Sequence, residues 1–536
     1  MMRYPKTLGT VSLILTLSAI ACAGGSIPTT KAANPINKPG SDEMQTQSAT
    51  TTIQSFTVVE GNDLMSKLES AQVKARTRQT PYWSAYAFDV RPGVAVDAAF
   101  REFNGTINTL GDTSVMVGTT SNGITVETRN LAVFLLRDPS ANQIIRMEVY
   151  NLERKREYAG YPVYWLGRAN NEESLNYLRA LVGAAPLDNL SERAVLGIAL
   201  HDDVRVGGML KNLISTSPNP KIRSSSVYWL GQVGGEQAFL ASLVSNNAED
   251  AKIRRQAAHA IGNSHDRGTM ATLQQLFEGI KDIDIHRSII SAAGASDELQ
   301  PAFNFLLTVA KGDEDWESRR MAVRQLGRFH TEAGTDELLR IYSSETNVEV
   351  KKAALRSLAE TKSAKAYARV VEIARNDNNI ELRKQAVRVL SDKGEAAIDD
   401  LLKLYDAEQA PQVKRSVLQS LGDIKNARVE DKLFEVARNG ETVDLRRQAI
   451  RLLGERVGKR SFDFLSATAQ SSDANADVQV QAVRAIGERR SDESVALLIK
   501  IARTHPNQQV RKQAIRSLGD SGDPRAVEFF REVLTK

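Results

Sequence analysis

The feature that most constrains this chain is a short pattern that recurs every 31 to 33 residues through its C-terminal two thirds. Each copy ends on a small residue, usually glycine, which always follows an apolar residue. The small residues are Gly231, Gly262, Gly294, Gly327, Ala359, Ser391, Gly422, Gly454, Gly487 and Gly519. A fixed period of this length is the signature of a solenoid, in which each unit buries its apolar face only against its neighbours.

The last copy, Val510 to Leu534, shows what one unit contains. At about 100° per residue, Val510, Ala514 and Leu518 lie on one apolar face of a helix. Gly519, Asp520 and Gly522 are expected to break this helix, because glycine reaches the left-handed conformation of a C-terminal cap. Asp523-Pro524 then starts a second helix. The pattern predicts about twelve such helix pairs, with a period of about 32 residues, over residues 156–536.

The string V-R-x-x-A-x-x-x-L-G at residues 510–519, followed by G-D-P-x-A-V at 522–527, resembles the short bacterial HEAT-like repeats that also occur in phycobilin lyases. The resemblance covers roughly seventy per cent of the chain, although Ser391 departs from the glycine column. It implies a mainly α fold, an α-solenoid. It indicates little about activity, since HEAT-like arrays mostly act as binding scaffolds and a fold does not dictate a function.

Residues 1–21 are predicted to be a signal peptide, because Arg3 and Lys6 precede an uncharged stretch that is too short to span a bilayer comfortably. The segment from Ala19 to Cys22 allows two cleavage sites. Ala-x-Ala suits ordinary signal peptidase, which would remove the signal before Cys22. The small residues before Cys22 also resemble a bacterial lipobox, which would make this single cysteine the site of lipid attachment. The second alternative predicts an exported, periplasmic lipoprotein anchored in the outer membrane.

Residues 22–52 carry almost no large apolar side chain and are predicted to form a flexible linker behind the lipid anchor. Residues 53–155 differ, because a short helix near 62–74 is followed by runs rich in β-branched and aromatic residues. These runs are 82–90, 94–103, 114–118, 124–129, 131–137 and 144–150. They predict a small antiparallel β domain, which either caps the N-terminal end of the solenoid or binds a partner of its own.

Two cations four residues apart recur on the polar side of the first helix of several units. They are Arg320 and Arg324, Lys352 and Arg356, Lys384 and Arg388, Arg447 and Arg451, and Lys512 and Arg516. Like charges at this spacing repel slightly, so helix stability does not explain them. The HEAT resemblance implies that they line the concave surface. They form either a basic groove for an acidic protein or a solvated face whose charge is balanced elsewhere, since the net charge is only +5.

A further column of cations lies inside the apolar arc. Its members are Arg223, Arg254, Arg319, Lys351, Arg383, Lys414, Arg446 and Arg511. A cation there lays its aliphatic stem on the core and pairs with a carboxylate or carbonyl of the adjacent unit, so we expect a structural role. Candidate partners in the turns are Asp423, Glu455, Glu488 and Asp520.

The string Val-Tyr-Trp-Leu-Gly occurs twice, at residues 163–167 and 227–231. Its aromatic residues fall at or near the polar side of the helix, where exposed aromatics are favoured anchors of interfaces. Tyr228 and Trp229 are therefore candidate partner-binding residues, whereas Trp165 is expected to pack against the β domain.

Catalysis finds little support. The six histidines show no metal-ligand spacing such as H-E-x-x-H, and the acid-rich group around His201 has no partners that must converge. No catalytic residue, metal or cofactor is expected. The sequence thus predicts a non-enzymatic scaffold of the cell envelope that binds a protein partner through the concave face. Nucleic acid is not expected, because an exported protein seldom meets it. The alternative is a lyase-like enzyme or chromophore-handling protein on the same fold.

Overall fold

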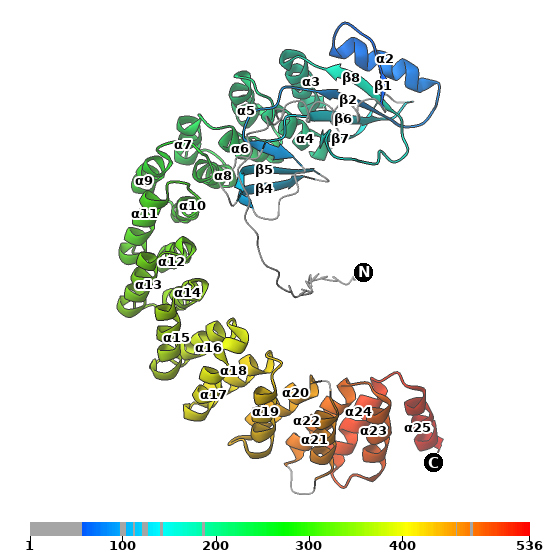
Figure 1. Ribbon diagram of the computed structural model, residues 1–536, viewed down its shortest axis with the longest axis vertical. Helices are drawn as coiled ribbons and strands as arrows, with labels where there is room; N and C mark the ends of the chain where they lie inside the picture. The colour runs from blue at the N-terminus through cyan, green and yellow to red at the C-terminus, as the bar shows by residue number, and fades with distance from the viewer. Residues whose placement is uncertain are drawn as a thin grey trace, which may run out of the picture. The chain divides into compact units, whose positions relative to one another are not determined.

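The computed structural model describes residues 56–96, 103–110, 113–120, 127–139, 143–184, 188–456, 458–471 and 475–535. The signal peptide, Cys22 and the linker expected from the sequence lie outside these ranges. Figure 1 shows a small β region followed by a long array of helices. Within the described ranges, no helix is long and apolar enough to cross a bilayer.

The strands are β1 (Thr57–Val58), β2 (Tyr82–Ala87), β3 (Val94–Val96), β4 (Phe103–Leu110), β5 (Thr113–Thr120), β6 (Leu131–Arg137), β7 (Ile144–Asn151) and β8 (Val163–Arg168). The first helices are α2 (Leu64–Arg76), α3 (Asn171–Ala184), α4 (Asp188–Ala199), α5 (Arg205–Thr216), α6 (Pro220–Val233), α7 (Gln237–Ser245), α8 (Ala251–Gly262), α9 (Thr269–Gly279), α10 (Ile283–Ala293), α11 (Leu299–Gly312) and α12 (Trp316–Leu326). Next come η1 (Gly327–Phe329), α13 (Glu332–Ser344), α14 (Val348–Glu360), α15 (Ala364–Asn376), α16 (Ile380–Ser391), η2 (Gly394–Ala397), α17 (Ile398–Ala407) and α18 (Pro411–Gly422). The last are α19 (Ala427–Asn439), α20 (Val443–Gly454), α21 (Lys459–Gln470), α22 (Ala476–Glu488), α23 (Asp492–Thr504), α24 (Gln508–Gly519) and α25 (Pro524–Thr535).

The β region contains a five-stranded sheet, in the order β1-β8-β2-β6-β7, and a three-stranded sheet, β3-β5-β4. The antiparallel pairing expected from the sequence is found between β2, β6 and β7 and between β3, β5 and β4. The run predicted at 124–129 is not a strand where it is described. All residues of β2 are buried, and Tyr86 bonds to Ser174 of α3 (3.1 Å). The β region therefore packs directly on the first helices of the array.

The first copy of the Val-Tyr-Trp-Leu-Gly string is a strand and not part of a repeat. It forms β8, which lies between β1 and β2 and runs parallel to both. The solenoid was expected to begin at residue 156, but β8, the last strand of the β region, follows that position. The first helix of the array, α3, begins at Asn171. The helices from α3 onward form eleven pairs followed by α25, one pair fewer than the approximate number expected from the sequence.

Even-numbered helices stack on one another along the inner edge of the array, with the odd-numbered helices outside them (Figure 1). The inner helices begin where a short polar side chain accepts a hydrogen bond from the first turn. These N-caps include Asp250, Asp282, Asp315, Asn347, Asn379, Thr442, Asn475 and Asn507. Such a cap stabilises a helix by about 1 kcal/mol, which explains why the repeats start in register.

The glycine column has a different role from the one expected. None of its glycines has a positive φ, whereas Gly522, in the turn after α24, has a φ of 67°. A Cβ added at Gly231, Gly262, Gly294, Gly327, Gly422, Gly454 or Gly487 would lie only 2.2 to 2.7 Å from an atom of the next inner helix. The column thus permits close helix packing. Where Ala359 replaces glycine, it lines a cavity of about 350 Å³.

Candidate partner-binding surface

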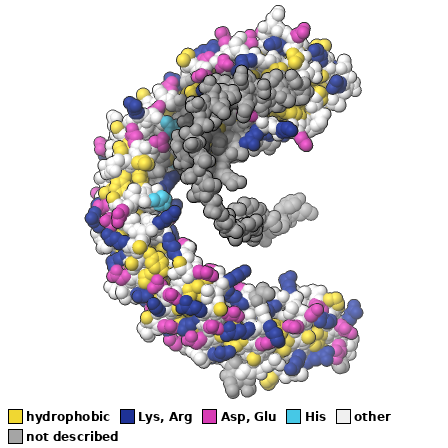
Figure 2. Space-filling model, in the orientation of Figure 1, with side chains coloured by type: hydrophobic (Ala, Val, Ile, Leu, Met, Phe, Trp, Pro, Cys, Tyr) yellow, Lys and Arg dark blue, Asp and Glu magenta, His cyan; other side chains and the backbone are white. Residues whose placement is uncertain are grey.

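The predicted cations form two rows across the inner helices α12 to α24. The first basic row comprises Arg320, Lys352, Lys384, Arg415, Arg447 and Lys512, and the second basic row comprises Arg324, Arg356, Arg388, Arg451, Arg484 and Arg516. Most of the second row is exposed, while four members of the first row are half-buried. Figure 2 shows Lys and Arg side chains along the inner edge of the C-terminal helices. The cations thus lie on the inner helices, and their role in binding a partner stays a prediction.

The first basic row is largely neutralised by its own helices. Lys352 pairs with Glu349 (2.8 Å), and Lys384 pairs with Glu381 (2.9 Å), each one turn earlier. The hydrogen bond from Lys384 lowers the pKa of the Glu381 carboxyl. Arg415 pairs with Asp444 of the next inner helix (3.0 Å). These cations have local partners and add little net attraction.

The second basic row is different. Among the pairs between described residues, only Arg451 of this row has a carboxylate partner, Glu455, and it also donates to Gln419 (2.6 Å). Across the described parts of the chain, no carboxylate lies within 4.0 Å of the guanidinium groups of Arg324, Arg356, Arg388, Arg484 and Arg516. Exposed charges that have no carboxylate this close remain available for a partner.

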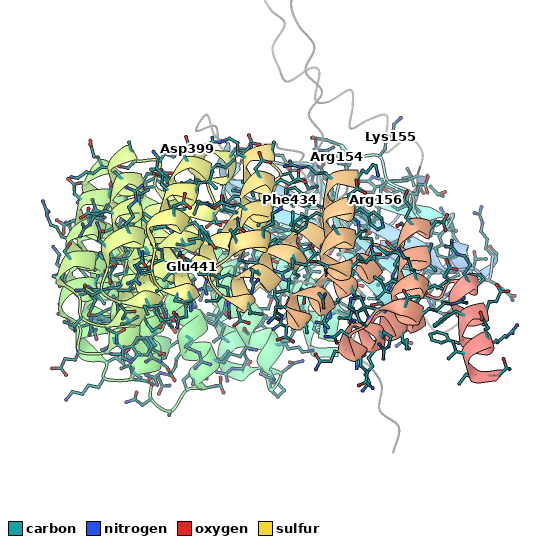
Figure 3. All side chains as sticks on the ribbon, turned by 90° about the horizontal axis from the view of Figure 1, so that it is seen from below. Arg154, Lys155, Arg156, Asp399, Phe434 and Glu441 are labelled. Atoms are coloured by element: carbon teal, nitrogen blue, oxygen red, sulfur yellow. The ribbon has the colours of Figure 1, made fainter. Side chains whose placement is uncertain are left out.

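The acids that balance the chain are engaged on the outer helices, as their positions in the sequence suggested. Arg428 pairs with Asp399 (2.6 Å), Arg460 with Asp431 (2.7 Å) and Arg525 with Asp492 (2.6 Å). Each bridge joins one outer helix to the preceding one. In Figure 3, Asp399 lies at the opposite end of the outer helices from Glu441, which pairs with Lys414. These carboxylates are therefore not available to neutralise the inner face.

A groove of about 520 Å³ opens on the inner face between α16 and α18. Lys384, Arg388 and Arg415 line it together with the amides of Gln419 and Gln448. The Nε2 atom of Gln448 donates to the carbonyl of Arg415 (2.9 Å), while its Oε1 is buried and has no hydrogen-bond partner. Within the described residues, Arg388 has no ion pair, and it shares this groove with the unsatisfied Oε1 acceptor of Gln448.

The two aromatic candidates do not form an exposed anchor. Trp229 is only 3% exposed, because it packs in the apolar core of the array. Tyr228 is half-buried, bonds to Asn108 of β4, and has a pKa raised by burial. Tyr228 therefore helps to join the array to the β region. The exposed arc estimated for an isolated helix did not include these neighbours.

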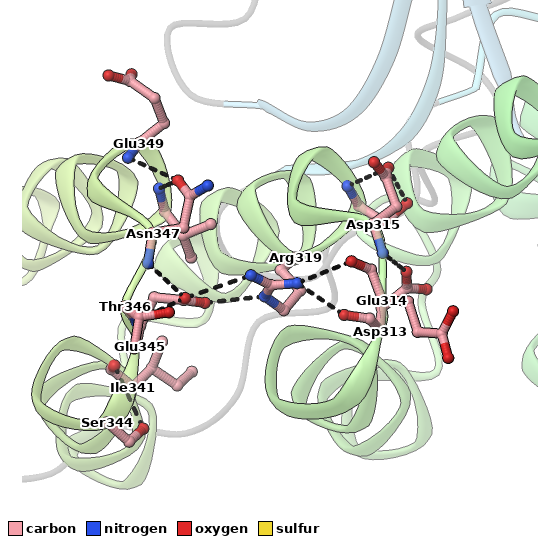
Figure 4. A network of polar contacts seen from close by, with 12 residues as sticks. Asp313, Glu314, Asp315, Arg319, Ile341, Ser344, Glu345, Thr346, Asn347 and Glu349 are labelled. Atoms are coloured by element: carbon pink, nitrogen blue, oxygen red, sulfur yellow. Dashed lines mark hydrogen bonds and ion pairs between the residues drawn. The ribbon is translucent and has the colours of Figure 1, made fainter.

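The cation column inside the apolar arc is structural, but its partners differ from those expected. Arg319 donates to both oxygens of Glu345 (2.9 and 3.3 Å) and to the carbonyls of Asp313 and Glu314 (Figure 4). Arg383 bonds Glu408 and the carbonyl of Asp377 in the same way. The carboxylates come from the turn that precedes the next inner helix, not from the turns that follow the glycine column.

His201 is a buried structural residue. Its Nδ1 lies 2.7 Å from the carbonyl oxygen of Gly197 and its Nε2 lies 2.8 Å from Ser174 Oγ. The ring stacks on Phe88 with centroids 4.2 Å apart. Burial lowers the pKa of His201 to about 4.

The pKa of His201 predicts acid sensitivity at the N-terminal end of the array. An unfolded histidine titrates near pH 6.5, so between about pH 6.5 and 4 the unfolded state binds a proton that the folded state excludes. Stability is therefore lost as pH falls through this window, by at most about 3 kcal/mol. His201→Phe should flatten the fall in melting temperature between pH 7 and 5. His330→Gln, at an exposed position, should retain the wild-type slope, and equal slopes in both variants would contradict the assignment.

The structure also shows an exposed aromatic residue that the sequence argument missed. Trp316 opens α12 with 37% of its surface exposed, and the Arg320 guanidinium lies 5.5 Å from the centre of its ring. Counting back four residues from each first-row cation, to the first position of the helix, could have found it.

Comparison with known proteins identifies the repeats. Residues 303–391, 368–454 and 462–536 match the sequence profile of HEAT repeats. No curated protein sequence matches the chain significantly. Similar solved structures include human deoxyhypusine hydroxylase, at 14% identity over 53% of this chain and 95% of that one, with a TM-score of 0.23.

Two further structures have comparable likeness. The CpcE and CpcF complex of phycocyanin lyase from Nostoc matches at 17% identity over 43% of this chain and 92% of that one, with a TM-score of 0.23. Kap121p bound to Pho4p matches at 15% identity over 68% of this chain and 47% of that one, with a TM-score of 0.40. At such identities and TM-scores, nothing about activity or partner follows.

Proposed function

We propose that this HEAT-like repeat protein is a non-enzymatic scaffold that binds an acidic protein partner along the inner face of helices α12 to α24. The contrast between the two faces carries the proposal. On the outer helices Arg428, Arg460 and Arg525 pair with carboxylates of the neighbouring repeat, whereas five arginines of the second basic row have no carboxylate within 4.0 Å among the described residues. Isolated surface pairs contribute little to stability, so the uneven distribution favours a role in binding.

The chemistry of the second basic row favours carboxylates. All six members are arginine, whose planar guanidinium group binds a carboxylate through two parallel hydrogen bonds. The row crosses α12, α14, α16, α20, α22 and α24, which is far longer than a small molecule. A solenoid offers such a surface to an extended or large partner.

Reversing the second basic row should abolish partner capture. Arg356→Glu, Arg388→Glu and Arg484→Glu together are expected to reduce capture from an envelope fraction at least about tenfold, because three attractions become repulsions. The matched control reverses Lys403, Lys500 and Arg531, which are exposed on outer helices. Capture is measured by pull-down with tagged protein, and helical content by circular dichroism.

The control variant changes the net charge by the same amount and should capture normally. Capture by the wild type should also weaken as salt rises from about 50 to 300 mM, since screening shortens the reach of exposed charges. Full capture by the inner-face variant, with its helical content intact, would show that the basic rows are merely solvated.

The envelope location is part of the same proposal and rests on residues 1–21 and Cys22. Lipid attachment at Cys22 would hold the folded repeats at a membrane through the linker of residues 22–52. Cys22→Ser should move the protein from the membrane fraction to the soluble fraction of fractionated cells, while Ser26→Ala should not. A Cys22→Ser protein that still sediments with membranes would exclude the anchor.

A further inference from the structure

The inner face carries a third row, which is apolar. The first residue of α10, α12, α14, α16 and α20 is Ile283, Trp316, Val348, Ile380 and Val443, respectively. Ile283 is 44% exposed, and Trp316 and Ile380 are each 37% exposed. Val348 and Val443 are half-buried, so the exposed members of the row lie on α10, α12 and α16. An exposed apolar residue at the same place in several helices is an unusual use of surface.

The three rows share one face of each helix. In α12 they are Trp316, Arg320 and Arg324, and in α16 they are Ile380, Lys384 and Arg388, always four residues apart. Residues at this spacing lie one above the other along a helix. A partner that crosses α12, α14 and α16 therefore meets the same order of apolar side chain, cation and arginine in each of them.

The spacing of the helices restricts the conformation of such a partner. Packed helices lie about 8–10 Å apart. A polyproline II segment has three residues per turn at about 3.1 Å each, so its side chains repeat every ~9.3 Å. A β-strand repeats one face about every 6.6 Å and loses register after one or two helices. Only a polyproline II segment can therefore place every third side chain opposite the arginine of each successive helix.

The groove between α16 and α18 supplies an independent argument. The buried Oε1 of Gln448 has no donor, and Gln412 and Gln419 place further amides in the same groove. A polyproline II segment leaves its backbone N–H and C=O groups unpaired, so a non-proline residue in it can donate to Gln448. An α-helix has used these groups internally and has none to offer along its length.

We infer that the inner face binds a polyproline II segment of an acidic protein, with a carboxylate at every third residue set against the second basic row. This inference rests on the proposed function and specifies its ligand. Carboxylates at about 9.3 Å intervals meet Arg324, Arg356 and Arg388 on the successive inner helices α12, α14 and α16. The intervening residues, prolines among them, contact the apolar row.

The test compares two labelled peptides of equal composition by fluorescence anisotropy with the full chain. One is (Glu-Pro-Pro)6, and the other is (Glu-Pro)6 followed by six prolines, which has the same charge at a different spacing. The first should bind at least about tenfold more tightly. Its affinity should fall by a similar factor in Arg356→Gln/Arg388→Gln, and several-fold in Gln448→Met. The outer-face variant Lys403→Gln/Lys500→Gln should bind like wild type.

The outcomes separate this inference from the function on which it rests. Equal affinity for the two peptides would overturn the polyproline II register and leave an acidic partner in place. Absence of binding by both peptides, together with normal capture of the envelope partner, would also overturn the inference alone. Peptide binding that survives the arginine changes would contradict both.

Discussion

Gly262→Ala is expected to weaken the contact between α8 and α10 by about 1–3 kcal/mol. A Cβ at residue 262 would lie 2.3 Å from the carbonyl oxygen of Ala292 and 2.8 Å from its Cα. These are backbone atoms, which cannot rotate away as a side chain can, so the two helices must separate. Because each repeat contacts only its neighbours, the damage should stay local and divide the array into two less coupled parts.

Gly519→Ala is the matched control, since Gly519 closes the same pattern in α24. Nothing lies within 4 Å of the Cβ added there, and alanine favours a helix over glycine by about 0.5–1 kcal/mol. Hydrogen exchange of α8 and α10 should accelerate strongly in the first variant, while α24 is unchanged or better protected in the second. If the two variants behave alike, the column glycines only end the helices and do not permit close packing.

This contrast shows how much of the fold the sequence predicts. The period of the glycines correctly predicted a solenoid of helix pairs, because burial on one face of each helix leaves its mark within a single repeat. The left-handed conformation expected of the column glycines was wrong. Their actual role is close packing, which depends on the next repeat. Ala292 faces Gly262 from 30 residues away, and no local pattern indicates that approach.

The repeated string Val-Tyr-Trp-Leu-Gly makes the same point about secondary structure. Val163–Arg168 is a strand held between β1 and β2, while Val227 to Gly231 lies inside the helix that begins after Asn219. Valine, tyrosine and tryptophan suit strands. The second copy is helical because Asn219 caps the helix, Pro220 starts it, and Trp229 packs in the core. The same five residues therefore form a strand in one place and a helix in the other, because their tertiary neighbours differ.

The candidate surface was predictable in outline only. The position of Arg324, Arg356 and Arg388 in each repeat placed them on the polar side of their helices, and the HEAT resemblance implied the inner face. The sequence could not show that Lys384 is paired with Glu381 while Arg388 has no carboxylate within 4.0 Å among the described residues, since both cations look alike in the sequence. Nor could it show the burial of Trp229, which depends on its tertiary neighbours.

Arg319→Met should also destabilise the array, by about 3 kcal/mol in the region of α12 to α14. The Arg319 guanidinium bridges Glu345 and the end of α11, and the side chain of Glu345 is only 8% exposed. Without Arg319, that carboxylate keeps only neutral donors such as the N–H groups of Thr346 and Asn347 (each 2.8 Å). A buried charge that loses its counter-ion costs more than the pair contributed.

The control is Arg324→Met, five residues along the same helix, which removes an equal charge from the exposed second basic row. It should change local stability by less than about 0.5 kcal/mol. Adding Glu345→Gln to Arg319→Met should recover part of the loss, because no unpaired charge then remains buried. Hydrogen exchange of α12 and α14 measures all three variants. If Arg319→Met and Arg324→Met exchange alike, then the cation column does not stabilise the stacking of repeats, and the distinction between structural and available cations on the inner helices fails.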